Sequence, residues 1–168
     1  MILTKSAIMR EIKLGNLKIE PFDESAIGAG SVDLTLDNKF RIFKKRRGVY
    51  NATENASHEE ITSFKEADKL ILKPKELVLG ITVEKITLPE NICGWLQGRS
   101  TFARLGLLVH ISAPFMQPGI SNKQVLEIYN ASTIPIAIYP GTKICQFIFE
   151  RTEGRATYKG KFANQEKP

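Results

Sequence analysis

The hydrophobic residues of this chain recur mostly at every second position, which is the period of a half-buried strand. Val32, Leu34 and Leu36, for example, alternate with polar residues. Turn-forming pairs such as Pro118-Gly119 and Pro140-Gly141 separate the later runs. The pattern predicts strands at residues 32–36, 40–43, 77–84, 92–96, 107–112, 124–130, 134–138 and 144–150. Many short strands divided by regular turns are typical of a β-barrel or a β-sandwich.

Two short helices are expected within this mainly β pattern. Residues 4–14 are amphipathic with a helical period, and Gly15 can end that helix. A second short helix is expected directly after Arg99, where Ser100 can cap the first turn. Gly106 can end that helix in a left-handed conformation.

Two segments lack the strand pattern. Residues 44–68 open with the charge run Lys44-Lys45-Arg46-Arg47 and continue with few apolar residues. This composition favours a solvated excursion over a patch that binds nucleic acid. His58 lies in the excursion without a candidate partner, so we assign it no role. Residues 151–168 are polar and basic, and their composition alone indicates a frayed terminus.

The length of 168 residues fits a single domain, residues 1–168, with a hydrophobic core. The hydrophobic fraction of 42% and the charged fraction of 25% are ordinary for a globular protein in water. No apolar run approaches the roughly 20 residues that cross a bilayer, and the first residues lack the features of a signal peptide. We therefore expect a cytoplasmic protein with no membrane partner.

The cysteines and histidines do not form a metal-binding pattern. Cys93 and Cys145 both lie in apolar, strand-like runs, so we expect two buried, reduced thiols. With His58 and His110 they are too scattered for a structural zinc site. The signature of zinc-dependent nucleobase deaminases needs His-x-Glu and Pro-Cys-x-x-Cys, which this sequence lacks. The sequence therefore does not carry the zinc site of that enzyme class.

The net charge of +6 favours anionic ligands. The basic residues form no single long stripe, and aromatic residues are not interleaved with them as stacking on bases would require. A nucleoside triphosphate therefore fits the excess of positive charge better than nucleic acid does.

Candidate chemistry is concentrated in residues 98–130. The helix after Arg99 would present free backbone N–H groups at its start, with Arg99 and Arg104 nearby, and this combination suits a phosphate. Glu127 is the one acidic residue of the predicted strand 124–130. A carboxylate in apolar surroundings loses hydration, and Arg104 is the candidate cation to compensate. The pattern suggests a nucleotide enzyme; the alternative is that Glu127 is an exposed strand residue or forms a plain ion pair.

Motifs in a characteristic order run along nearly the whole chain. They are Ser31-Val32-Asp33-Leu34, Leu88-Pro89, Gly94-Trp95-Leu96, Gly98-Arg99-Ser100-Thr101-Phe102-Ala103-Arg104-Leu105-Gly106-Leu107, Val125-Leu126-Glu127, Tyr129-Asn130, Pro140-Gly141 and Lys161-Phe162-Ala163-Asn164-Gln165. Together they resemble dCTP deaminase of the trimeric dUTPase superfamily. No single motif is decisive, but their number, order and spacing make the resemblance specific.

This resemblance implies a mainly β fold, a distorted jelly-roll-like β-barrel of the dUTPase type that assembles as a homotrimer with active sites between subunits. The implied reaction is hydrolytic deamination of dCTP to dUTP and ammonia. Mg²⁺ would be bound through the triphosphate, and dTTP is a candidate feedback inhibitor. The segment around Asp33 would be structural, near the trimer centre. The tail, residues 151–168, would close over the bound triphosphate.

The resemblance also implies the site residues. Glu127 would move protons between water, N3 of the base and the leaving amino group. Ser100 would orient the reacting groups, and Arg104 would hold the geometry of Glu127. Arg99 and Thr101 would face phosphates. The other implied substrate-binding residues are Phe102, Ala103, Ala113, Gln117, Val125, Leu126, Tyr158, Lys161 and Gln165, with backbone groups of Val125 and Leu126 against the pyrimidine edge.

Gln117 departs from the family pattern, which has an acidic residue at this position. An amide can hydrogen-bond a 3′-hydroxyl but cannot act as a base near neutral pH. The change argues against further hydrolysis of dUTP. The alternatives that stay open are a bifunctional enzyme that yields dUMP, a plain dUTPase, and a non-catalytic nucleotide-binding relative. His110 matches a family histidine, and we expect it to support the site from behind.

Overall fold

A computed structural model describes residues 1–45 and 47–168 of the chain. Arg46, in the predicted charge run, lies outside the described residues, while Lys44, Lys45 and Arg47 are exposed. Within the described part, no helix is long and apolar enough to cross a membrane.

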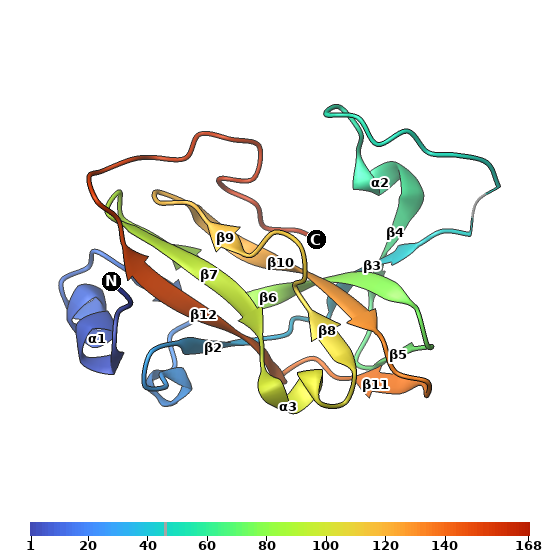
Figure 1. Ribbon diagram of the computed structural model, residues 1–168, viewed down its shortest axis with the longest axis horizontal. Coiled ribbons are helices and arrows are strands. Elements are labelled where there is room, and N and C mark those ends of the chain that lie inside the picture. The colour runs from blue at the N-terminus through green and yellow to red at the C-terminus, as the bar shows by residue number, and fades with distance from the viewer. Residues whose placement is uncertain (46) are drawn as a thin grey trace.

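Strands form most of the fold (Figure 1). The helices are α1 (Lys5–Lys13), α2 (His58–Ile61) and α3 (Ser100–Ala103), with a 3₁₀ turn, η1 (Glu24–Ala26). The strands are β1 (Lys18–Glu20), β2 (Val32–Thr35), β3 (Lys39–Phe43), β4 (Thr62–Glu66), β5 (Leu70–Leu72), β6 (Leu77–Thr87), β7 (Ile92–Gly98), β8 (Leu107–Val109), β9 (Phe115–Met116), β10 (Ser121–Asn130), β11 (Ile136–Ile138) and β12 (Lys143–Arg151).

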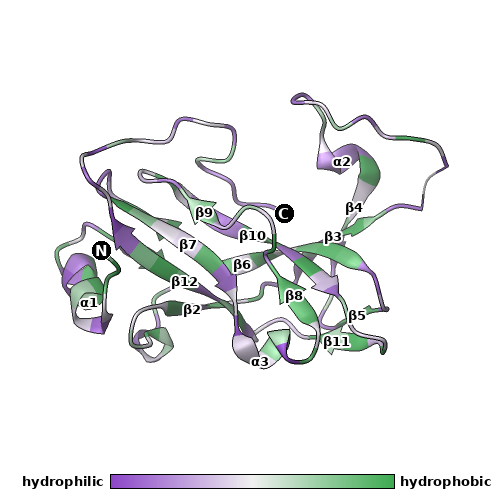
Figure 2. Ribbon diagram, in the orientation of Figure 1, coloured by the Kyte–Doolittle hydropathy of each residue, from purple (hydrophilic) through white to green (hydrophobic). Residues whose placement is uncertain are grey.

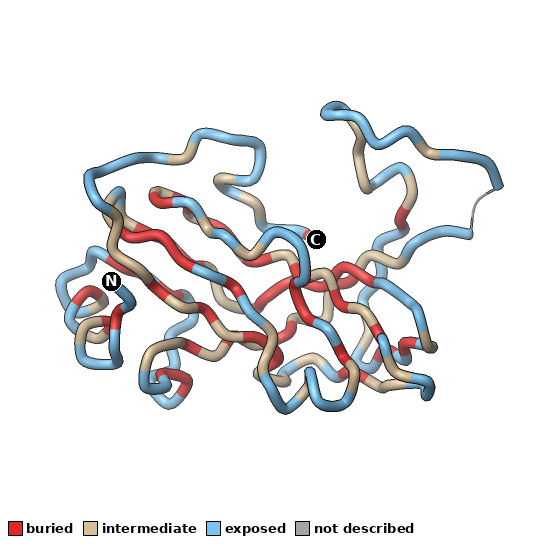
Figure 3. Tube along the Cα trace, viewed as in Figure 1, coloured by how far each residue is buried: buried red, intermediate tan, exposed pale blue. Residues whose placement is uncertain are grey.

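Two sheets and a small ribbon enclose one hydrophobic core. The larger sheet has the order β4-β3-β6-β10-β8, with β1 also paired to β6, and the second has the order β2-β12-β7-β9. β5 and β11 form the ribbon. Figures 2 and 3 show how hydrophobic, buried positions alternate with more exposed ones along β10 and β12. The two sheets contribute Phe40, Leu126 and Phe147 to the core, each with 0% of its surface exposed.

The mainly β fold class predicted from the sequence is confirmed, and each predicted strand has a counterpart in the structure. The helix predicted at residues 4–14 is α1. Gly106 has a φ of 80°, as expected for a left-handed helix end. The prediction that Ser100 caps α3 is wrong. Arg99 holds the cap position, because its carbonyl accepts the first helical hydrogen bonds. Among the described residues, no side chain forms a cap hydrogen bond at this end of α3.

The excursion predicted at residues 44–68 is solvated only in its first half. Residues 58–66 form α2 and β4, and β4 pairs with β3 from Thr62 opposite Phe43 to Glu66 opposite Lys39. Only Thr62 of β4 is buried. An edge strand of this kind is held by its backbone hydrogen bonds, so it leaves no alternation of hydrophobic residues for sequence analysis to find.

The tail is ordered against the body of the protein. It leaves the end of β12, passes above β9 and β10 in Figure 1 and ends close to β3. The amides of Ser121 and Lys123 on β10 donate hydrogen bonds to the tail carbonyls of Ala163 and Gln165, each at 2.9 Å. The expectation from composition, a frayed terminus, is therefore wrong, because the tail pairs with the free edge of β10.

Candidate functional site

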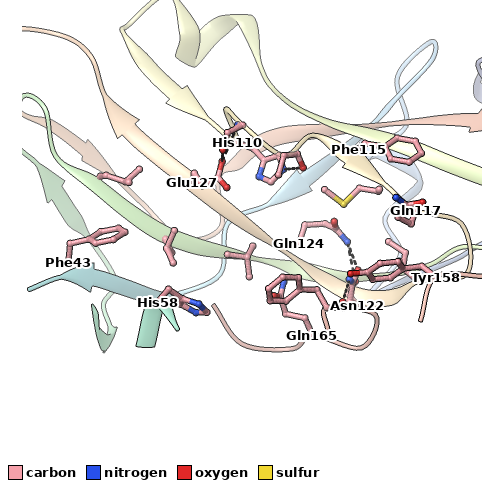
Figure 4. A pocket seen from close by; sticks show the side chains of 18 residues that line it. Phe43, His58, His110, Phe115, Gln117, Asn122, Gln124, Glu127, Tyr158 and Gln165 are labelled. Atoms are coloured by element: carbon pink, nitrogen blue, oxygen red, sulfur yellow. Dashed lines mark hydrogen bonds between the residues drawn. The ribbon is translucent and has the colours of Figure 1, made fainter. Parts of the chain in front are cut away.

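A pocket of about 560 Å³ lies between the tail, the larger sheet and the loop that follows β8 (Figure 4). Its walls come from β3, α2, β6, β9, β10 and the tail, so segments far apart in sequence meet around it. The lining residues are Phe43, His58, Leu77, Leu79, His110, Ser112, Ala113, Phe115, Met116, Gln117, Ile120, Asn122, Gln124, Val125, Glu127, Tyr158, Phe162 and Gln165.

Glu127 is the one carboxylate among the lining residues that the structure describes. It is half-buried on β10, directly opposite Leu79 of β6. Its Oε2 accepts hydrogen bonds from the amides of Ile111 at 3.2 Å and Ser112 at 3.3 Å, and from Oγ of Ser112 at 3.2 Å. Its Oε1 has no hydrogen-bond partner among the described residues. One oxygen is thus fixed, and the other remains available to a ligand or a water.

His110 holds the loop that binds Glu127. Its backbone has a φ of 56°, and its amide donates to the Glu127 carbonyl at 2.8 Å. Its Nε2 lies 2.8 Å from the carbonyl oxygen of Ala113. Because a carbonyl can only accept, Nε2 carries the proton of this hydrogen bond. Nδ1 is buried without a partner among the described residues. His110 therefore bridges both ends of the loop, and its supporting role for the site stays a prediction.

A short stretch of the β10 edge is open to the pocket. The amide of Lys123 donates to the tail, and the carbonyl of Glu127 accepts from His110, so both point away from β6. The amide of Gln124 points the other way, to Oγ1 of Thr82 on β6, at 2.9 Å. Backbone direction alternates along an antiparallel strand. The N–H and C=O of Val125 therefore face the gap between the tail and the loop, where they can form hydrogen bonds with the edge of a planar ring.

The tail closes one side of the pocket. Tyr158, Phe162 and Gln165 line it, and Asn122 donates from Nδ2 to the carbonyl of Phe162 at 2.7 Å. Gln124 in turn donates from Nε2 to Oδ1 of Asn122 at 2.7 Å. Asn122 and Gln124 are 6% and 2% exposed, so this polar chain is fixed by burial and holds the tail over the pocket.

Six of the site residues implied by the sequence lie together around this pocket: Ala113, Gln117, Val125, Glu127, Tyr158 and Gln165. In Figure 4 the side chains of Gln117, Tyr158 and Gln165 lie to one side of Glu127, and those of Phe43 and His58 lie to the other. Leu126 does not reach the pocket, because its side chain is fully buried and its backbone pairs with Gly80 of β6. Lys161 is exposed, with its ammonium 5.6 Å from the centre of the Phe162 ring.

The residues of and around α3 lie outside the pocket of their own chain. They are Arg99, Ser100, Thr101, Phe102, Ala103 and Arg104. Phe102 instead lines a separate apolar cavity of about 90 Å³, beside β11 and β12. The ion pair expected between Arg104 and Glu127 is absent from the ion pairs of the described residues, and Arg104 is exposed. Hydrogen bonds from the loop after β8, and not an ion pair with Arg104, stabilise the Glu127 carboxylate.

Arg99 is occupied by contacts within its own chain. Its Nη2 lies 3.0 Å from Oδ2 of Asp33 on β2, and its Nη1 donates to the carbonyl of Lys143 on β12 at 2.5 Å. β12 lies between β2 and β7 in the second sheet, so this pair spans a whole strand. The guanidinium is one-third exposed and can still offer donors to a ligand.

Sequence reasoning missed several lining residues. Phe43, His58, Leu77 and Phe115 come from elements that carry no recognised motif. His58, expected to have no role, reaches the pocket from α2, which an ion pair between Glu59 and Arg41 ties to β3. Periodicity places Leu77 on a strand face but does not say which face turns toward a cavity.

Among the described lining residues there is no lysine or arginine, so a single chain offers little positive charge to a bound anion.

The described residues hold no cluster of three or more His, Cys, Asp or Glu side chains that could bind a metal ion. Cys93 and Cys145 are free and buried, as the sequence predicted, and burial raises the pKa of both thiols.

Comparisons with known proteins agree on one family. The family model described as "dCTP deaminase-like" matches residues 2–152. A protein of Parafrankia sp. (strain EAN1pec), named "dCTP deaminase, dUMP-forming", is 38% identical over 177 residues that cover 100% of this chain and 88% of the relative. A protein with the same name from Mycolicibacterium vanbaalenii is 40% identical, over 94% of this chain and 84% of the relative.

Solved structures agree on the fold. The 2′-deoxycytidine 5′-triphosphate deaminase from Agrobacterium tumefaciens superposes with a TM-score of 0.70 at 19% identity, covering 90% of this chain and 48% of that one. This chain thus spans about half the length of that protein. The dUTPase from phage phi11 of S. aureus superposes with a TM-score of 0.52 at 13% identity, covering 86% of this chain and 96% of that one. The expected dUTPase-type fold is confirmed.

Proposed function

The chain belongs to the dCTP deaminase-like family, and we propose that it catalyses the hydrolytic deamination of dCTP, with Glu127 as the group that activates water. The single observation that carries the proposal is the state of the Glu127 carboxylate. Oε2 is fixed by the loop after β8, while Oε1 is free of partners among the described residues, and the Glu127 side chain that carries it lines the pocket.

The chemistry follows from one carboxylate beside an open strand edge. The N–H and C=O of Val125 hold the edge of the pyrimidine, which brings C4 toward Glu127. Glu127 takes a proton from water, the resulting hydroxide adds to C4, and Glu127 passes this proton to N3 as the tetrahedral centre forms. Glu127 then takes the proton of the new C4 hydroxyl and passes it to the amino group, which leaves as ammonia while C4 becomes a carbonyl. The carbonyl of Ala113, held by His110, can orient the water or the leaving group.

The triphosphate needs positive charge that the pocket of one chain does not supply. The described lining residues contain no lysine or arginine, whereas Arg99 and Arg104 lie beside α3, outside the pocket. We therefore propose that α3 of a second copy completes each site, in a homotrimer. Ser100 and Arg104 would then act across the interface, and Lys161 of the tail would reach the phosphates. Mass measurement in solution tests this assembly; a monomer that turns over dCTP would contradict it.

Mg²⁺ fits this site as a companion of the substrate. Glu127 alone cannot hold a divalent ion through protein oxygens, and Mg²⁺ keeps several waters when it binds to phosphates. We propose that the ion enters on the triphosphate and neutralises part of its charge, while the steps at C4 use the residues of the chain.

The relatives support a reaction that continues beyond dUTP. Both are named dUMP-forming, at 38% and 40% identity, and we propose dUMP and pyrophosphate as the final products with ammonia. A reaction that stops at dUTP is the second candidate, and Gln117 favours it. Gln117 lines the pocket where a carboxylate would serve as a base for attack on phosphate, and an amide cannot take that proton.

Chromatography of the products after incubation with dCTP and Mg²⁺ tests the proposal. Ammonia with dUMP and pyrophosphate is the expected result, and ammonia with dUTP would support the second candidate. dCTP that binds and stays intact would contradict both and leave a non-catalytic nucleotide-binding protein.

A further inference from the structure

Arg41 shares a sheet face with Glu127. In the larger sheet, Arg41 of β3 lies opposite Leu79 of β6, and Leu79 lies opposite Glu127 of β10. Residues paired across neighbouring strands project to the same face of a sheet. Arg41 therefore stands two strands from Glu127, about 10 Å away by the usual strand spacing. Only 13% of its side chain is exposed, so its guanidinium depends on protein partners.

The guanidinium divides its donors between two separate segments. Nε donates to the carbonyl of Pro168 in the tail at 2.5 Å. Nη2 forms an ion pair with Oε1 of Glu59 on α2 at 3.1 Å, and Nη1 donates to Oγ1 of Thr62, directly after α2, at 3.4 Å. The planar fork of an arginine suits such a junction, because it can serve several acceptors in fixed directions at once.

Both segments are walls of the pocket. α2 supplies His58, and the tail supplies Phe162 and Gln165. Among the described residues, no hydrogen bond or ion pair joins α2 to the tail directly, so Arg41 is their common polar contact. None of the motifs found in the sequence includes Arg41 or α2.

We propose that Arg41 is a positioning residue for nucleotide binding, which couples the seating of the tail over the pocket to the position of α2. Loss of the α2 contact then loosens the tail, although no polar contact joins α2 to the tail within the part of the chain that the structure describes. The nucleotide part of this inference rests on the proposed function, whereas the coupling concerns the free protein.

Amide hydrogen exchange on the free protein tests the coupling. The amides of Ser121 and Lys123 donate to carbonyls of the tail, so their exchange reports whether the tail is seated. Glu59→Gln removes the charge that pairs with Arg41. We expect exchange at Ser121 and Lys123 to become about threefold faster, since an ion pair with one exposed partner contributes modestly. Arg41→Ala should accelerate it about tenfold.

Two further variants control this experiment. Glu54→Gln removes an exposed carboxylate that makes no hydrogen bond or ion pair among the described residues, and it should leave exchange at Ser121 and Lys123 unchanged. Arg41→Lys keeps the charge but loses the fork, and its exchange should fall between those of the wild type and Arg41→Ala. Unchanged exchange at Ser121 and Lys123 in Glu59→Gln would overturn the coupling, even if Arg41→Ala failed to fold.

Steady-state kinetics test the nucleotide part. Glu59→Gln should raise KM for dCTP about threefold and leave kcat within about twofold, because the tail retains substrate and does not touch the reacting atoms. An unchanged KM, or an equal rise in Glu54→Gln, would overturn this role. A wild-type protein without turnover would instead defeat the proposed function, and the exchange measurement would still decide the coupling.

Discussion

Ser112 donates two hydrogen bonds to Oε2 of Glu127, from its Oγ at 3.2 Å and from its amide nitrogen at 3.3 Å. The loop that carries Ser112 is itself tied to β10, because the amide of His110 donates to the Glu127 carbonyl. The orientation of the proposed catalytic group therefore depends in part on the hydroxyl of Ser112, to which the sequence alone assigned no role.

Ser112→Ala should lower kcat for dCTP deamination about tenfold, because a hydrogen bond to a charged acceptor contributes roughly 1.5–3 kcal/mol. The two amide donors would remain, so we expect the fold and KM to change little. Ser112→Thr keeps the hydroxyl and should retain most of the activity. A Ser112→Ala enzyme with the wild-type kcat would remove this residue from the positioning of Glu127.

Glu127→Gln should abolish ammonia release while leaving dCTP binding largely intact, because the amide cannot take a proton from water. Binding can be followed by fluorescence of Trp95, the single tryptophan of the chain, whose ring centre lies 5.1 Å from that of the pocket residue Phe115. Turnover that persists in this variant would show that another group activates the water.

Gly119→Ala should raise KM for dCTP by displacing the tail. Gly119 has a φ of 78°, and an added Cβ would lie 2.8 Å from Cγ2 and 3.0 Å from Cα of Thr157 in the tail. Gly141→Ala is the matched control, since Gly141 has a φ of 83° but no atom of the described residues lies within 4 Å of the added carbon. Both variants should lose about 1–2 kcal/mol of stability from left-handed strain. Only Gly119→Ala should weaken binding, and equal KM values for the two would argue against contact with the tail.

We expect the protein to lose stability in acid, because Glu11 becomes protonated there. Glu11 is 5% exposed and anchors α1 to the end of β12. The hydrogen bond from Asn16 and the contact with Arg151 hold the pKa of Glu11 below its ordinary value of 4.5, against the opposing effect of burial. Because the folded-state pKa is the lower one, ionised Glu11 stabilises the fold above pH about 4.5, and this stabilisation is lost as the pH falls through the folded-state pKa.

Thermal unfolding of Glu11→Gln tests this dependence. The variant should melt below the wild type at pH 7, and the difference in Tm should shrink as the pH falls below 4.5. A difference that stays constant over this range would mean that the charge of Glu11 contributes nothing to stability.

The sequence by itself determined where the main strands lie along the chain and which residues carry the candidate chemistry. Alternation of hydrophobic residues located the main strands, because each must bury one face. Gly106 marked the left-handed end of α3, since glycine adopts a positive φ without steric cost. The motifs identified the family and singled out Glu127, Val125 and Gln117, which do meet around one pocket.

Only the tertiary structure decided which of these residues share a pocket, because that depends on how distant strands pair. The register of β3, β6 and β10 brings Arg41 and Glu127 to one face, and the folding of α2 brings His58 to the rim. The tail has the composition of a frayed terminus, yet the free edge of β10 gives its backbone hydrogen-bond partners. α3 and its arginines, placed beside Glu127 by the sequence motifs, lie outside the pocket of their own chain, because β7 carries them away from it.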